Sequence, residues 1–370
     1  MDIIEQLKQF TRTCENNLRN SISTKKKNIV IISYYPTYRS QFGELIKKLK
    51  KSYNVIVVVD RILNDDFEKS GHHCVLFPWR MQEGGKTYYI NANVKGIDLI
   101  LTADQVGYDN GKIDREFLNK SAKRIYFPHR LTCMCGASKL LDYIIVPSKS
   151  AMSGFKYRLK DSSVKLLPCG YPQFDLALKN YKYKSKNTIT YAPTLRYADP
   201  TKITSLNAFT GADNNIIEWL LKNTNHNISY RAHPINYSSN PTFYQLIQKT
   251  WEGEKRVSID AKMGNDFFNY SDFLVTDWST TSFSYSYTTL RPSFFYMPYP
   301  LDDSLKHDGG YIIEDKRAKN FAELRDFLEN IDYKKEKEYF LHLREENIYN
   351  SGRSVESILE NIELILQGKL

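Results

Sequence analysis

Hydroxyl-bearing and charged side chains follow several short apolar runs of this sequence, at the points where predicted strands end. After the run 272–276 comes Asp277, and hydroxyls follow at Ser279, Thr280 and Thr281. We expect the strand to end at Asp277, a good N-cap, and a helix to begin in the hydroxyl-rich turn. The N–H groups of a first helical turn, the helix dipole and these hydroxyls can together bind a phosphate, although capping alone also explains the residues.

Two histidines stand at comparable positions. His233 ends the run that contains Arg231, and the proline after it disfavours helical backbone at His233. His129 ends an earlier run and is followed by Arg130. An imidazole at a strand end can donate to a phosphate or a leaving group, or act as a base. A structural histidine is the alternative in both cases, and Arg130 is either a phosphate ligand or a surface charge.

The loop after the first predicted strand is a third candidate, with Tyr34 and Tyr35 in a position that suits an acceptor molecule. The sequence has no Gly-x-Gly-x-x-Gly, Walker A, His-Glu-x-x-His, Gly-x-Ser-x-Gly or protein-kinase motif. Seven histidines and few paired carboxylates argue against metal-dependent hydrolysis and glycosidase chemistry. We therefore expect no metal and no cofactor.

The elements that must position these residues are apolar runs separated by helical stretches, a pattern that indicates parallel sheets. The expected strands are 28–33, 54–59, 74–77, 98–102, 124–127, 143–147 and 165–168, and then 188–192, 228–232, 256–259, 272–276 and 293–297. Ligands of such sheets bind beyond the carboxyl ends of the strands. The pattern predicts an α/β protein with two doubly wound domains and a cleft between them.

The predicted domain boundaries follow from a polar, lysine-rich stretch in the middle of the chain. We expect an N-terminal Rossmann-like domain over 1–180, which begins with an amphipathic helix over 1–24. A C-terminal Rossmann-like domain should cover 187–330, and helices should follow over 331–370. The mixed charges of the first helix favour docking on the protein over lying on a membrane.

Length and composition bound the function. The chain has 370 residues, of which 41% are hydrophobic and 25% charged, which excludes disordered, collagen-like and coiled-coil classes. Its 52 Lys and Arg against 42 Asp and Glu give a net charge of +10, and residues 1–60 hold eleven of the bases and five of the acids. This excess suits an anionic partner, such as nucleic acid, a membrane surface or a phosphorylated substrate.

Cysteine usage and hydropathy indicate the compartment. The five cysteines are scattered and lack metal-ligand spacing, as expected of buried thiols in a reducing cytoplasm. No apolar run reaches the roughly 18 residues of a spanning helix, and no signal peptide is recognisable. We predict a cytoplasmic protein that contacts the inner face of a bacterial membrane only at its surface.

Taken in order between residues 126 and 354, the motifs resemble the CDP-glycerol glycerophosphotransferase family, which builds teichoic-acid-like and capsular polyol-phosphate polymers. The matching segments are His129, Asp142–Ser148, Gly170–Asp175, Tyr191–Arg196, Arg231–Pro234, Asp277–Thr280, Arg291–Tyr296 and Ser351–Ser354. No single segment is specific to the family, whereas their order and spacing together are.

The resemblance implies a GT-B fold, with the nucleotide held mainly by the C-terminal domain and a final helix that crosses back. It implies transfer of a polyol phosphate, with glycerol phosphate the first choice, from a CDP-activated donor to a hydroxyl of a cell-surface polysaccharide or a lipid-linked acceptor. CMP is the leaving group, and no catalytic metal takes part. Nucleic acid drops to a minor candidate partner.

The resemblance also implies residue roles. His129 would be the base that deprotonates the acceptor hydroxyl, and His233 with the Ser279–Thr281 turn would stabilise the pyrophosphate and the departing CMP. Arg196 would help to hold the donor, and we expect Arg231 and Asp277 among the donor- and phosphate-binding residues as well. Tyr34, Tyr35 and Arg130 are the residues we expect on the acceptor side.

The sequence departs from the family's motif at one place, and two alternative functions remain open. The family usually continues its first histidine with Gly-Thr-Pro, whereas Arg130-Leu131-Thr132 follows His129, which leaves a sugar hydroxyl open as the acceptor. The alternative enzyme is a GT-B glycosyltransferase or nucleotide-sugar epimerase of capsule or lipooligosaccharide synthesis that uses a UDP- or CMP-sugar. A non-enzymatic basic adaptor on membranes or nucleic acid is the third hypothesis.

Overall fold

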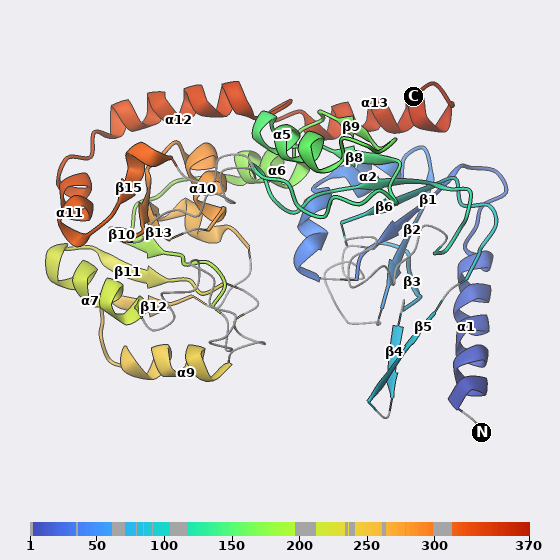
Figure 1. Ribbon diagram of the computed structural model, residues 1–370, viewed down its shortest axis with the longest axis horizontal. Coiled ribbons are helices and arrows are strands. Elements are labelled where there is room, and N and C mark those ends of the chain that lie inside the picture. The colour runs from blue at the N-terminus through green and yellow to red at the C-terminus, as the bar shows by residue number, and fades with distance from the viewer. Residues whose placement is uncertain are drawn as a thin grey trace. The chain divides into compact units, whose positions relative to one another are not determined.

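The computed structural model describes residues 3–34, 36–60, 71–78, 80–83, 85–90, 92–103, 117–196, 212–233, 236, 241–260, 264–277, 279–298 and 313–370. The chain forms two compact units. Unit 1 comprises residues 1–130, 134–176 and 349–370, and unit 2 comprises residues 131–133 and 177–348. Each unit is an α/β structure built on a parallel sheet (Figure 1). The predicted fold class is confirmed.

Unit 1 contains a seven-stranded sheet whose strands all run parallel. In spatial order they are β3 (Cys74–Leu76), β2 (Asn54–Val59), β1 (Asn28–Ile32), β6 (Leu99–Thr102), β7 (Lys123–Tyr126), β8 (Tyr143–Ile145) and β9 (Lys165–Leu167). Strand order reverses between β1 and β6. Every residue of β1 is buried, because helices cover both faces of a doubly wound sheet.

The helices of unit 1 cover the two faces of this sheet. They are α1 (Ile3–Asn20), η1 (Pro36–Phe42), α2 (Leu45–Leu49), α5 (Lys149–Arg158) and α13 (Ser354–Leu366), and α6 (Pro172–Asn180) contains the boundary between the units. Val30 and Ile32 share one core cluster with Leu18 of α1. Ile29 and Ile31, on the opposite face, pack in a second cluster with α13. The alternation of β1 side chains thus builds two cores.

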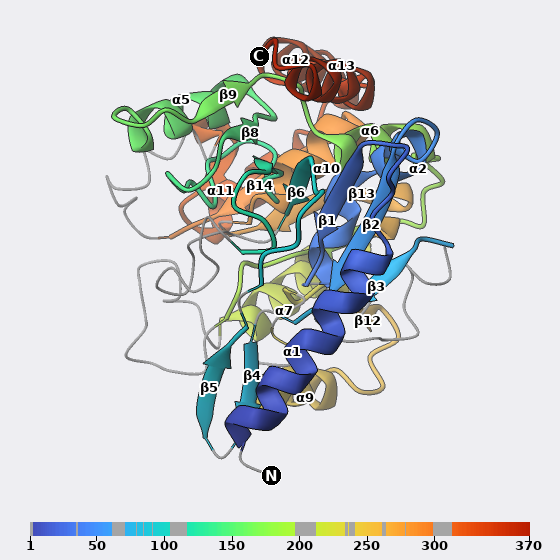
Figure 2. The ribbon, with the colours of Figure 1, turned by 90° about the vertical axis from the view of Figure 1, so that its right-hand side faces the viewer.

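Both ends of the chain dock on unit 1. The predicted N-terminal helix forms and lies beside β3 (Figure 2). It buries Cys14 and Leu18, so its apolar face is used inside the protein. At the other end, Asp175 of α6 accepts from the backbone N–H groups of Gly352 (2.8 Å) and Ser354 (2.7 Å), which fixes the start of α13. The final helix therefore packs with the N-terminal sheet, as expected for a GT-B chain.

Unit 2 contains a six-stranded parallel sheet of the same kind. Its order is β12 (Val257–Ile259), β11 (Asn227–Tyr230), β10 (Thr188–Tyr191), β13 (Ser271–Thr276), β14 (Ser293–Tyr296) and β15 (Arg317–Ala318). Its helices are α7 (Asp213–Asn223), α9 (Pro241–Thr250), η4 (Asp266–Asn269), α10 (Thr281–Thr289), η6 (Glu314–Lys316), α11 (Phe321–Glu329) and α12 (Tyr333–Asn347). Strand order reverses between β10 and β13.

At the amino ends of several strands, an aspartate side chain accepts from a backbone N–H of the neighbouring strand. Asp98 accepts from the backbone N–H of Asn28 at 2.8 Å, and Asp142 does the same for Arg124 at 2.8 Å. In unit 2, Asp272 accepts from the N–H of Thr188, again at 2.8 Å. Each carboxylate satisfies the N–H of the first or second residue of a neighbouring strand, which would otherwise lack a partner at the sheet edge.

Some features differ from expectation. An antiparallel hairpin of β4 (Arg80–Glu83) and β5 (Lys86–Tyr89) was not predicted, because its residues are mixed in polarity and too few to show a period.

The cysteines are free thiols, four of them buried, and burial raises the pKa of Cys14 and Cys169 to about 11. No helix within the described part of the chain is long and apolar enough to cross a membrane.

The turn at Gly170 generates a prediction. Its φ is +93°, and an added Cβ would overlap the Tyr349 carbonyl oxygen and the Ser354 hydroxyl. We expect Gly170→Ala to lower the free energy of unfolding by about 3 kcal/mol or more, from left-handed strain plus overpacking. Gly352→Ala is the matched control, because φ is +80° there but nothing lies within 4 Å of the added Cβ. It should cost about 1 kcal/mol. Urea denaturation measures both, and equal losses would contradict the packing argument.

Candidate functional site

The candidate site lies at the carboxyl ends of β10, β11 and β13 in unit 2. Strand order reverses between β10 and β13, and ligands of open parallel sheets bind at such reversal points. We call the following residues the strand-end site: Thr194 and Arg196 after β10, Arg231, His233 and Asn236 after β11, and Asp277, Ser279, Thr280 and Thr281 after β13. The motifs predicted to bind the donor therefore come together at one sheet edge.

The hydroxyl-rich turn leads from β13 into α10, which begins at Thr281. The N-cap is Thr280, without a side-chain capping bond, and the Ser279 hydroxyl accepts from the Thr281 N–H at 3.4 Å. The prediction that Asp277 is the N-cap is wrong. Its carboxylate accepts instead from the backbone N–H of Thr194 at 2.8 Å and from Arg196. Asp277 thus joins the ends of β13 and β10.

Arg196 is the centre of a buried ionic network. Its side chain is 1% exposed, and its Nη1 lies 2.5 Å from Asp277 Oδ2. Its Nε and Nη2 donate to the two oxygens of Asp213, at 3.3 and 2.7 Å. These carboxylates hold the pKa of Arg196 well above its usual value despite burial, which acts to lower it. The guanidinium that the family resemblance assigns to the donor is thus engaged by two aspartates.

Asp213, the first residue of α7, is fully buried and has four hydrogen bonds. Besides the two from Arg196, it accepts from the hydroxyls of Tyr191 (2.7 Å) and Tyr230 (3.0 Å). Burial, and then the negative charge of Asp213, raise the pKa of Tyr191 well above its usual value. The hydroxyl therefore stays protonated and donates. The four lone-pair positions of a carboxylate are all occupied.

Asn236 connects the loop after β11 to the loop after β10. Its side chain accepts from the Arg196 N–H at 3.1 Å and donates to the Arg196 carbonyl at 2.5 Å. Its own N–H donates to the carbonyl of His233 at 2.8 Å. His233 is half-buried, and its backbone is thus placed by Asn236.

Arg231 is also buried and paired. Its Nη1 lies 2.6 Å from Asp260 Oδ2, its Nη2 donates to the Gly264 carbonyl, and its guanidinium lies over the Phe267 ring. These contacts connect the end of β11 to Asp260 and Gly264, which follow β12. A donor contact through Arg231 stays a prediction, as it does for Arg196 and Asp277.

The acceptor-side candidates lie in unit 1. His129 is half-buried, three residues beyond β7, and Arg130 beside it is exposed. Tyr34 is 4% exposed, and its hydroxyl donates to the Phe77 carbonyl at 2.7 Å in the core. We therefore no longer place Tyr34 on the acceptor side, because its polar atom is used internally. Tyr35 lies outside the described residues.

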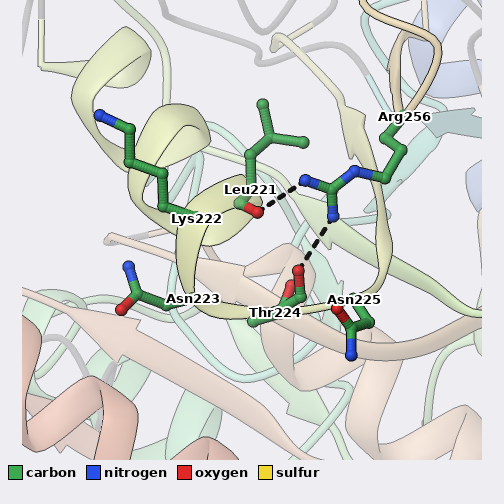
Figure 3. A pocket seen from close by; sticks show the side chains of 6 residues that line it. All are labelled: Leu221, Lys222, Asn223, Thr224, Asn225 and Arg256. Atoms are coloured by element: carbon green, nitrogen blue, oxygen red, sulfur yellow. Dashed lines mark hydrogen bonds between the residues drawn. The ribbon is translucent and has the colours of Figure 1, made fainter.

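A cavity of about 410 Å³ lies elsewhere, at the C-terminal end of α7 (Figure 3). It is lined by Leu221, Lys222, Asn223, Thr224, Asn225 and Arg256. Arg256 donates to the carbonyls of Leu221 (2.6 Å) and Thr224 (2.9 Å), so it caps the helix. These residues precede β11 and β12 and lie at the amino edge of the sheet, away from the strand-end site.

Sequence reasoning missed three residues, Asp213, Asn236 and Asp260. Each acts through a partner that is distant in sequence, and only Asp213 has a local signal, as an acid in a first helical turn. In the part of the chain that the structure describes, no three His, Cys, Asp or Glu side chains form a group that could hold a metal ion.

Comparison with known proteins places this geometry in a family. Residues 117–364 match the model of the CDP-Glycerol:Poly(glycerophosphate) glycerophosphotransferase family. No curated protein sequence matches the chain.

Solved structures share the fold. The wall teichoic acid polymerase TagF is 16% identical, with a TM-score of 0.62 over 99% of this chain and 95% of that one. A putative UDP-N-acetylglucosamine 2-epimerase from Listeria monocytogenes is 12% identical, with a TM-score of 0.59 over 93% and 97%. The UDP-GlcNAc 2-epimerase of Methanocaldococcus jannaschii is 12% identical, with a TM-score of 0.53 over 91% and 99%. At these identities the likeness concerns the fold.

Proposed function

The chain belongs to the CDP-glycerol:poly(glycerophosphate) glycerophosphotransferase family, and we propose that it transfers glycerol phosphate from CDP-glycerol to a hydroxyl of a cell-surface polysaccharide or lipid-linked polymer. The observation that supports this most is the hydroxyl-rich turn at Ser279–Thr281. This turn begins α10 next to the point where strand order reverses in the unit 2 sheet. Asp277 does not cap α10, because its carboxylate accepts from the Thr194 N–H. The wall teichoic acid polymerase TagF, which shares the fold, provides the precedent for a polymer product.

The proposed reaction is a displacement at phosphorus. An oxygen of the acceptor hydroxyl attacks the β-phosphorus of CDP-glycerol, the bond from that phosphorus to the bridging oxygen breaks, and CMP leaves with the electron pair. The acceptor proton passes to a base. Charge develops on the phosphoryl and bridging oxygens, so positioned hydrogen-bond donors can lower the barrier.

Unit 2 supplies the donors in this proposal. The N–H groups of the first turn of α10 and the hydroxyls of Ser279, Thr280 and Thr281 bind the pyrophosphate. His233 donates to the bridging oxygen as CMP leaves. Arg231 stiffens the neighbouring loop through Asp260.

Unit 1 supplies the base. We assign this role to His129 from the family resemblance, with Arg130 as an exposed cation that suits a phosphate-bearing acceptor. We propose that no metal takes part, since the hydrogen-bond donors and the imidazoles can stabilise the developing charge.

We further propose that unit 1 contacts an anionic membrane surface on the cytoplasmic side. Unit 1 holds 30 Lys and Arg against 20 Asp and Glu, a net charge of +10, whereas unit 2 has 22 of each. The outward face of α5 and the segment after it expose Lys149, Lys156, Arg158, Lys160 and Lys165, and Tyr157 among them is 68% exposed. An aromatic side chain surrounded by cations suits an anionic lipid surface.

A donor panel tests the proposed function. With CDP-glycerol, CDP-ribitol, a UDP-sugar and a CMP-sugar, we expect CMP release from a CDP-polyol only, read by mass spectrometry of the nucleotide. Release of UDP, or epimerisation of the UDP-sugar, would replace the proposal with the alternative that shares the fold of the epimerases. Vesicle or DNA binding with no turnover of any donor would favour a non-enzymatic adaptor.

The two histidines give the second test. We expect His129→Ala and His233→Ala each to lower CMP release by at least about 100-fold, because each removes a proton-transfer group. Thermal unfolding should show that both variants are folded. His342→Ala is the control, since His342 lies on α12, is 68% exposed and should have no effect. Near-normal turnover in both variants would overturn the assigned roles.

The third test concerns the membrane. Replacing Lys156, Arg158 and Lys160 by serine should reduce sedimentation with phosphatidylglycerol vesicles at least tenfold, because each cation contributes about 1 kcal/mol near such a surface. The control replaces Lys222, Lys249 and Lys255 of unit 2, which are equally exposed. Loss of binding in 0.5 M salt should accompany the effect. Unchanged binding in the first variant, or an equal loss in the control, would contradict a docking surface on α5.

A further inference from the structure

We infer that Arg196 is a positioning residue that couples the three loops of the strand-end site, and that it does not bind the donor. The inference concerns how the site is held and rests on the proposed function only for its kinetic test. Its starting point is that the guanidinium is only 1% exposed and that, among the residues that the structure describes, each of its three nitrogens donates to a buried aspartate.

The first coupling joins the loop after β10 to the turn after β13. Nη1 of Arg196 holds Asp277 Oδ2, and the other carboxylate oxygen accepts from the Thr194 N–H. The Thr276 hydroxyl adds a bond of 2.7 Å to the Ala192 carbonyl. Ser279 follows Asp277 by only two residues, so fixing Asp277 fixes where the phosphate-binding turn begins.

The second coupling joins the loop after β10 to the loop after β11. Asn236 pairs with both the N–H and the carbonyl of Arg196, and its own N–H holds the His233 carbonyl. The distance along the chain from His233 to this anchor is three residues. The backbone of Arg196 therefore sets the position of His233. The side chain of Arg196 sets the position of the turn at Ser279.

Asp213 makes the arrangement rigid. It binds Nε and Nη2 of Arg196 side-on, and two fully buried tyrosines, on β10 and β11, complete its hydrogen bonds. A planar guanidinium held at two edges has one orientation. A lysine ammonium, which is a point charge on a flexible chain, cannot bind two carboxylates in this geometry.

The test is Arg196→Lys, which preserves the charge and removes the fork. Hydrogen exchange should become at least about tenfold faster in 192–196, 231–236 and 276–283 together, and not in β12 or β14. With CDP-glycerol, kcat should fall at least about tenfold, while the donor KM changes less than about threefold. Faster exchange confined to 192–196, or a tenfold higher KM with kcat unchanged, would overturn the inference, because the latter is the signature of a lost ligand.

Two further variants keep the test decisive. Arg291→Lys is the matched control, since Arg291 pairs with Asp272 at the opposite edge of the same sheet and should leave the three loops and kcat unchanged. If Arg196→Lys does not fold, Tyr230→Phe removes a single hydrogen bond to Asp213. It should speed exchange about two- to fivefold in the same three segments, and no change there would overturn the inference. Exchange is independent of turnover, so absence of CMP release from the wild type would count against the proposed function alone.

Discussion

A buried guanidinium shared by two aspartates is the interaction on which the arrangement of unit 2 depends. Charges buried without partners are costly, and removing one partner of a buried pair costs about 3–5 kcal/mol. That is a large part of the roughly 5–15 kcal/mol by which a native protein is stable. The ends of β10 and β13 and the start of α7 must therefore meet Arg196 together. Such a network specifies one arrangement more than it adds stability, and the strand-end site lies directly on it.

At both ends of the strands, an aspartate accepts from the backbone N–H of a neighbouring segment and pairs with a cation. The two ends differ in whether that cation is exposed or buried. At the amino edges, Asp98 and Asp142 accept from a neighbouring strand's N–H and pair with the exposed Lys27 and Lys123. Solvent screens these pairs, so they contribute little. At the carboxyl edge of unit 2, Asp277 accepts from the Thr194 N–H in the same way, but its cation is buried. Because Arg196 is buried, the contacts of Asp277 hold the loop after β10 and the turn after β13 in one arrangement.

The sequence predicted most of the fold because strands buried on both faces appear as continuous apolar runs, as in β1 and β2. It also predicted the hydroxyl-rich turn that precedes α10, while phosphate binding at this turn stays a proposal. It did not predict the partners of Asp277, because capping is a local rule and Arg196 is 81 residues away. Asn236 has no local signal, and Asp213 shows only that of an acid in a first helical turn, since the roles of both arise only once β10, β11 and β13 lie side by side. Tyr34 looked accessible because it follows a strand, whereas packing decides where its hydroxyl lies.

The family match does not cover the two units equally. The family match covers 117–364 and includes every strand of unit 2, whereas β1 to β6 of unit 1 precede it. The network around Arg196 fixes the loops of unit 2 to which we assign the donor. Unit 1 carries the entire net charge of +10 and His129, whereas the departure Arg130-Leu131-Thr132 spans the boundary between the two units. Our proposal that the acceptor binds unit 1 therefore places differences in acceptor there, because unit 2 is constrained by its buried charges.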